Sequence, residues 1–106
     1  MEIKIYKIYD TERQLFFKGG WSNFDHNYGK QGKTWNNMGH VKNCLRGFID
    51  ESFIRDEKGK IITDDLLYGI KGWKNNIPDT WEVIEFSSVT GERRFKAKDL
   101  YPPTNE

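Results

Sequence analysis

The stretch that decides the fold is IKIYKIY at residues 3–9, which is rich in β-branched and aromatic residues and alternates like a half-buried strand. A turn at residues 10–13 and the sequence QLFFK at residues 14–18 follow it, and Gly19-Gly20 ends the segment. The order strand, turn, strand predicts an N-terminal β-hairpin.

A second hairpin is predicted near the other end of the chain. It consists of WEVIEF at residues 81–86, a turn at residues 89–92, and RRFKA at residues 93–97. Pro102-Pro103 then ends the ordered part, which gives one domain at residues 1–101 and a short polar tail at residues 102–106. The two hairpins are expected to join in one antiparallel sheet.

The first predicted helix begins at Asn37, a favourable N-cap, and runs through Ile49. Val41, Cys44, Leu45 and Phe48 follow the spacing i, i+3, i+4, i+7, which is typical of one buried helix face. Cys44 lies within this apolar stripe, so packing is the favoured interpretation of its thiol.

A second helix is predicted from Thr63, its cap, to Pro78. Asp64 and Asp65 would lie in the first turn, where the helix dipole favours acidic side chains. An apolar face would be formed by Leu66, Leu67, Ile70 and Trp73. The predicted fold class is therefore α+β: an antiparallel sheet from the N- and C-terminal hairpins, with two helices packed on one face.

The composition of the 106-residue chain excludes several classes of protein. Its one cysteine excludes an intramolecular disulfide framework and a multi-cysteine metal site. Residues 1–48 contain eight Lys or Arg against four Asp or Glu, while residues 49–106 contain nine against twelve. This asymmetry suits a small anionic ligand but is weak for a duplex-DNA binder. No segment approaches the roughly 18 apolar residues of a membrane span, and no secretory signal is evident, so a cytoplasmic protein without a membrane partner is expected.

The sequence gives little support to an enzyme. His26 and His40 do not have the spacing of a metal-binding motif. His40 and Cys44 are four residues apart on one helix, but the thiol lies on the apolar stripe, which argues against a reactive thiolate–imidazole pair. No catalytic residue, metal ligand or cofactor is therefore predicted. The sequence GKQGKT at residues 29–34 is similar to the end of a P-loop. However, Asn27 stands where a P-loop requires glycine, and no helix start follows directly.

A looser constellation of glycines, lysines and indoles surrounds the long loop at residues 21–37. Glycines let an anion approach the backbone, lysines neutralise phosphate, and tryptophans offer faces on which a base can stack. The predicted ligand-binding residues are Lys18, Gly19, Gly20, Trp21, Lys33, Trp35, Gly39, His40 and Lys42. In the alternative interpretation, Trp21 and Trp35 fill the core below the loop and the glycines only form turns.

The order of four short motifs resembles small bacteriophage accessory proteins that are functionally uncharacterised. These motifs are KGG at 18–20, GKTW at 32–35, GHVKNCL at 39–45 and WEVIEF at 81–86. The resemblance implies an infected bacterial cytoplasm as the setting. Small phage proteins there counter host defences, either by sequestering nucleotide signals or by binding a defence protein directly.

The leading expectation is therefore a non-enzymatic protein that sequesters a small anionic nucleotide-type signal of host defence. Lys18, Lys33 and Lys42 would contact phosphates, and Trp21 or Trp35 would stack on a base. The alternatives are a protein–protein inhibitor of a host defence protein and a small single-stranded nucleic-acid binder. A homo-oligomer with the site across its interface is compatible with a chain of this size.

Overall fold

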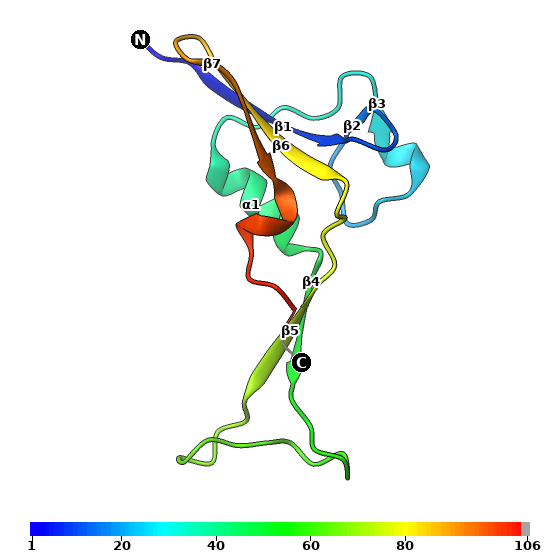
Figure 1. Ribbon diagram of the computed structural model, residues 1–106, viewed down its shortest axis with the longest axis vertical. Coiled ribbons are helices and arrows are strands. Elements are labelled where there is room, and N and C mark those ends of the chain that lie inside the picture. Colours follow the sequence, from blue (N-terminus) through cyan, green and yellow to red (C-terminus); the bar gives the residue numbers. More distant parts are fainter. Residues whose placement is uncertain (105–106) are drawn as a thin grey trace.

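The computed structural model describes residues 1–104 and shows a body from which a long arm projects (Figure 1). The body contains a five-stranded antiparallel sheet, and the arm is a two-stranded hairpin continued by turns. The overall dimensions are 52 × 33 × 17 Å, and the radius of gyration is 17.1 Å. Because a compact chain of this length has a radius of gyration of about 13 Å, the arm makes the molecule markedly elongated.

The two hairpins join in one sheet, as the sequence predicts. The strand order is β3-β2-β1-β6-β7, with β1 (Lys4–Asp10) and β6 (Trp81–Ser87) side by side. Their antiparallel register sets Ile8 opposite Val83, so that both side chains face the core. The sheet is completed by β2 (Leu15–Phe17), β3 (Tyr28–Gly29) and β7 (Gly91–Lys96).

One α-helix, α1 (Met38–Arg46), covers one face of this sheet (Figure 1). Asn37 caps it as predicted, since its backbone is extended and its Oδ1 accepts a hydrogen bond from the His40 N–H at 2.9 Å. The predicted stripe is buried at Val41 and Leu45. The helix ends at Arg46 rather than Ile49, because the chain turns there into the arm.

Aromatic rings fill the core between α1 and the sheet. The fully buried Trp81 lies with its ring centroid 4.6 Å from that of Phe17 and 5.0 Å from that of Phe48. The Trp81 Nε1–H donates a hydrogen bond to the Tyr28 hydroxyl at 3.0 Å, so the one polar group of the indole is satisfied. A few large rings thus supply the burial that a low apolar content would otherwise limit.

The predicted second helix is wrong. The segment at residues 63–77 instead contains β5 (Lys71–Asn75), which pairs antiparallel with β4 (Ile49–Phe53) to form the arm. Within residues 1–104 there is therefore one α-helix, together with the short 3-10 turns η1 (Asp25–Asn27) and η2 (Ala97–Leu100).

Local hydrogen bonding explains why no helix forms there. The Asp64 carboxylate accepts from the backbone N–H groups of Leu66 at 2.9 Å and Tyr68 at 3.0 Å. This turn competes with a helix for the same donors. Gly69 lies close to the Phe53 ring, since a Cβ there would come within 2.7 Å of it. The apolar spacing of Leu66 and Leu67 was misleading, since both side chains face solvent.

Hydrogen bonds also hold the loop before α1 and the C-terminal segment. Trp35 and Tyr6 form a single β-bridge, in which they exchange two backbone hydrogen bonds of 2.8 and 2.9 Å. In the predicted tail, Pro103 O accepts a hydrogen bond from Trp73 Nε1 at 3.0 Å, so residues 102–104 lie against the arm. The rest of that tail, residues 105–106, lies outside the described residues.

Among residues 1–104, no helix has the length and apolar character required to cross a lipid bilayer.

Candidate functional site

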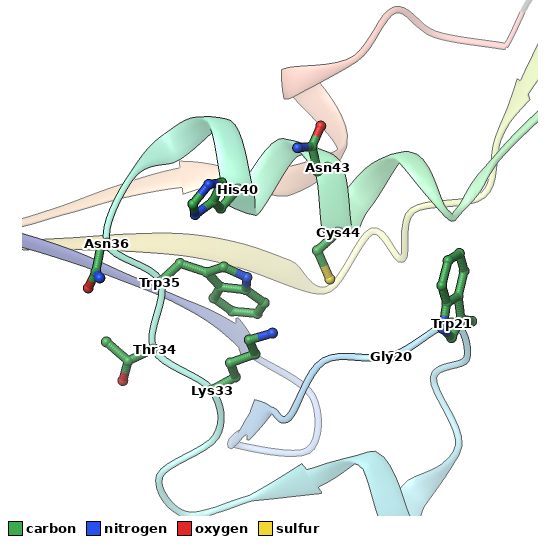
Figure 2. Close-up of a pocket in the computed structure, with 9 residues that line it drawn as sticks. All are labelled: Gly20, Trp21, Lys33, Thr34, Trp35, Asn36, His40, Asn43 and Cys44. Carbon is green, nitrogen blue, oxygen red and sulfur yellow. The ribbon is translucent and has the colours of Figure 1, made fainter.

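A groove of about 540 Å³ lies where α1, the loop before it and the corner after β2 meet (Figure 2). Three segments of the chain contribute to it: residues 20–21, residues 33–36 and the outer face of α1. Its lining residues are Gly20, Trp21, Lys33, Thr34, Trp35, Asn36, His40, Asn43 and Cys44. The volume is within the usual range for pockets that hold small molecules.

The backbone at Gly19 and Gly20 shapes one side of the groove. Both residues have positive φ, +91° and +109°, a conformation that glycine adopts without strain. A Cβ at Gly19 would lie only 3.1 Å from Cδ of Lys33, so the lysine side chain passes close to this backbone. The glycine pair thus ends β2 and lets Lys33 lie along the groove.

The two tryptophans of the groove have different roles. Trp35 is only 6% exposed and belongs to the core, where its backbone is held by the bridge to Tyr6. Trp21 is 88% exposed and stands on the opposite rim from His40 (Figure 2). The core interpretation is therefore right for Trp35, while Trp21 keeps a ring face free for contact.

Lys33 and His40 are the basic side chains that line the groove. The Lys33 ammonium lies 5.3 Å from the centroid of the Trp35 ring, a cation–π distance. His40 lies in the first turn of α1, with its Nδ1 3.5 Å from the Asn37 side-chain amide. The amides of Asn36 and Asn43 add neutral donors and acceptors to the lining.

Five of the nine predicted site residues thus line one groove: Gly20, Trp21, Lys33, Trp35 and His40. Gly19 lies directly behind this lining, against Lys33 and Trp35. The other three residues are placed elsewhere. The Lys18 side chain lies against Gly29, where a Cβ would approach its Cε to 2.8 Å, and the Lys42 carbonyl accepts a hydrogen bond from the Tyr101 hydroxyl. Gly39 lies beside the Asn37 cap, and the three predicted phosphate-binding lysines do not converge on the groove.

Cys44 lines the groove from α1, and Figure 2 shows its sulfur directed towards Trp35 and Lys33. Burial raises the pKa of this thiol above its ordinary value of 9.0, although the Lys33 ammonium and a hydrogen bond with the Gly20 backbone act in the opposite direction. A raised pKa keeps the sulfur protonated at neutral pH, and a protonated thiol is a poor nucleophile. Within residues 1–104, no group of three His, Cys, Asp or Glu side chains is arranged to hold a metal ion.

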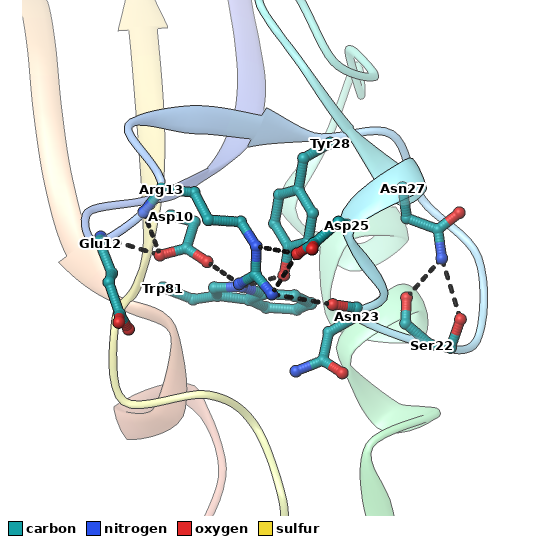
Figure 3. Close-up of polar contacts among 9 residues, drawn as sticks. All are labelled: Asp10, Glu12, Arg13, Ser22, Asn23, Asp25, Asn27, Tyr28 and Trp81. Atoms are coloured by element: carbon teal, nitrogen blue, oxygen red, sulfur yellow. Dashed lines mark hydrogen bonds and ion pairs between the residues drawn. The ribbon is translucent and has the colours of Figure 1, made fainter.

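A network of polar contacts, which the sequence did not reveal, connects the loop at residues 21–27 to the turn of the first hairpin (Figure 3). The Arg13 guanidinium forms ion pairs with the fully buried Asp10 at 2.6 Å and with Asp25 at 3.0 Å. It also lies 4.3 Å from the centroid of the Tyr28 ring. Arg13 therefore connects the first hairpin turn to the loop that carries Trp21.

The buried Asp10 carboxylate is held ionised by its partners. Burial opposes ionisation, but hydrogen bonds from the Arg13 side chain and from the backbone N–H groups of Glu12 and Arg13 outweigh it and keep the pKa of Asp10 below its ordinary 3.8. Within the loop that carries Trp21, the Asn27 side-chain amide donates a hydrogen bond to the Ser22 carbonyl at 2.8 Å. No local spacing distinguished Asp10 from an ordinary turn residue, because its place in the sheet, opposite Trp81, depends on a strand far along the chain.

Comparison with known proteins gives no relative for this chain: no protein-family model, curated protein or solved structure matches it. The resemblance to phage accessory proteins therefore stays a prediction, and function is argued from the groove itself.

Proposed function

We propose that the protein is a non-enzymatic binder of a small, planar, anionic ligand of nucleotide type, held in the groove between Trp21 and Trp35. The observation that carries the proposal is the convergence of five predicted residues from three chain segments on one groove of ligand size. In the phage setting that the sequence suggests, such binding would act by sequestering a nucleotide signal of host defence.

Each kind of group in the groove has a role in this proposal. The exposed ring of Trp21 stacks on the base, an interaction worth about 1–3 kcal/mol per base. The Lys33 ammonium pairs with a phosphate, and the Asn36 and Asn43 amides recognise the polar edges of the ligand. With one lysine in the lining, a monophosphate or cyclic phosphate suits the groove better than a triphosphate.

The test is a thermal-shift series on the purified protein with cyclic and linear mono- and dinucleotides. A ligand at 100 times its Kd adds about 2.7 kcal/mol to the native state, which corresponds to a rise in Tm of several degrees. The proposal would be abandoned if no nucleotide in the series raised the Tm.

Matched lysine variants locate the site once a ligand is found. Lys33→Ala and Trp21→Ala are expected to weaken binding at least about tenfold, which is about 1.4 kcal/mol. Lys18→Ala and Lys42→Ala, which remove the same charge outside the groove, should change the Kd less than about twofold. Equal losses in all three lysine variants would indicate a general charge effect rather than this site.

A second candidate is an inhibitor that binds a host defence protein. The observation in its favour is the exposure of two aromatic side chains on the loop at residues 21–27, Trp21 and Phe24. Aromatic anchors of this kind carry much of the energy in protein interfaces. This candidate predicts retention of one defence protein by the wild-type chain, loss of retention in Phe24→Ala, and no Tm shift with nucleotides.

A further inference from the structure

The end of the arm consists of two hairpin lobes that repeat one backbone design eight residues apart. The first lobe is closed by the bridge between Arg55 and Ile61, and the second by the bridge between Thr63 and Gly69. Backbone hydrogen bonds of 2.8 Å connect three isoleucines with the same spacing, Ile54, Ile62 and Ile70, into a ring. The lobes therefore diverge from one common base.

Each lobe is organised by an aspartate at the same position. Asp56 Oδ1 accepts hydrogen bonds from the N–H groups of Lys58 and Lys60, both at 2.9 Å. In the same way, Asp64 Oδ1 accepts from the N–H groups of Leu66 at 2.9 Å and Tyr68 at 3.0 Å. The fourth residue of each turn has a left-handed backbone: φ is +83° at Gly59 and +66° at Leu67. The lobes are thus equivalent in backbone and differ in side chains.

The side chains of the second lobe do little to stabilise the lobe itself. Leucine is disfavoured in the left-handed conformation that Gly59 adopts freely in the first lobe. Leu66, Leu67 and Tyr68 are 75%, 81% and 68% exposed, so most of their apolar surface is not buried within the chain. Contiguous apolar side chains that face solvent on a projecting element mark a contact with another molecule.

The charges of the second lobe indicate which kind of surface it contacts on that molecule. The second lobe carries Asp64 and Asp65 and no basic residue, whereas in the first lobe Arg55, Lys58 and Lys60 offset Asp56 and Glu57. The groove of the body has the complementary character, with Lys33, His40 and the exposed Trp21. The arm points away from the body, so a lobe cannot enter the groove of its own chain (Figure 1).

We propose that the tip formed by Leu66, Leu67 and Tyr68 docks in the groove of a second copy of this chain. Leu66 and Leu67 pack beside Trp21, and the Asp65 carboxylate pairs with Lys33 of the other copy. A single tip in a groove buries less than the roughly 1,000 Å² of a specific interface. The contact is therefore reciprocal: two copies exchange arms about a two-fold axis, and each fills the other's groove.

This arrangement affects the ligand proposed above, because tip and ligand share the groove. A nucleotide that binds there displaces the tip and dissociates the dimer. That consequence rests on the proposed function, whereas the self-association does not. A dimer that no nucleotide dissociates would count against the ligand and leave the arm contact intact.

Sedimentation of the purified full chain over a range of concentrations tests the contact directly. The average mass is expected to rise towards twice the monomer value. Leu66→Ser, Leu67→Gly and Asp65→Lys should each weaken the dimer at least about tenfold, as truncation of an interface anchor does. Glu57→Lys, the same charge reversal in the first lobe, is the matched control and should leave the mass profile unchanged.

A charge exchange gives the sharpest result. Asp65→Lys alone and Lys33→Asp alone should both be monomeric, but an equimolar mixture should form a heterodimer in which both tip contacts are restored. Two results overturn the proposal: a wild-type chain that stays monomeric at every concentration, or a dimer that the tip variants do not weaken. A monomeric wild type that retains a foreign protein through Leu67 would assign the tip to that partner instead.

Discussion

The body and the arm of this protein are both built from antiparallel hairpins, yet they bury very different amounts of side chain. In β6 of the body, four of seven residues are buried, and two of them, Trp81 and Val83, belong to the aromatic-rich core. In β4 of the arm, none of five is buried. The body therefore carries the folding energy, while the arm is free to carry residues chosen for contacts.

The largest difference between the two regions is expected for tryptophan truncation. Trp81→Ala removes a fully buried indole from the body and should lower the free energy of unfolding by about 3–5 kcal/mol, enough to unfold a marginal domain. The exposed Trp21→Ala should change it by less than about 0.5 kcal/mol. Urea denaturation followed by circular dichroism measures both, and similar losses would contradict the assignment of the core.

The next difference concerns the carboxylates Asp10 and Asp64, which both accept backbone hydrogen bonds. Asp10 is buried, so Asp10→Asn should cost about 1–3 kcal/mol at neutral pH. Asp64→Asn acts on an exposed lobe and should cost less, as measured by the same urea titration.

The pH dependence of stability separates the same two carboxylates. Because the pKa of Asp10 is lower in the folded protein than its ordinary 3.8, its contribution is complete above that pH and is lost as the pH falls through the folded-state value. Asp10→Asn should therefore flatten the acid limb of the stability profile. An unchanged acid limb would show that other carboxylates control it.

A smaller effect is expected from exchanging residues between the two lobes of the arm. In the Lys33→Asp background, where the proposed tip contact is absent, Leu67→Gly relieves a left-handed leucine and should slow amide exchange in the second lobe, whereas Gly59→Leu introduces the same cost of about 1–2 kcal/mol into the first. Hydrogen exchange resolved by residue measures each lobe separately. Faster exchange in Leu67→Gly would mean that leucine contributes contacts to the lobe itself.

The last prediction concerns the reactivity of the Cys44 thiol rather than the stability of the fold. Since its pKa is raised, alkylation at neutral pH should be slower than for an unstructured peptide thiol, and the rate should climb as the pH rises past the ordinary value. A groove ligand should slow it further. Rapid alkylation at neutral pH would contradict the protonated thiol.

Sequence reasoning identified the body well because its signals are local and agree with one another. The alternation at residues 3–9, the Asn37 cap and the stripe through Val41 and Leu45 each act within one element. It failed at residues 63–77 because apolar spacing does not reveal burial. Leu66, Leu67, Ile70 and Trp73 follow a helical period, but the Asp64 turn and the left-handed backbone at Leu67 override it.

For the candidate site, the sequence named a segment of the chain but not which of its residues meet in the groove. Three lysines could be named from spacing, yet only Lys33 reaches the groove.

By itself, then, the sequence determined two paired hairpins, one capped helix and a segment rich in glycine, lysine and tryptophan. Only the tertiary structure decided that Trp35 belongs to the core while Trp21 faces solvent, that Asp10 is buried with Arg13, and that a predicted helix is instead a projecting arm. The physical reason is that hydrogen bonding along one strand or helix is a local property, whereas burial and convergence depend on residues far apart in the chain.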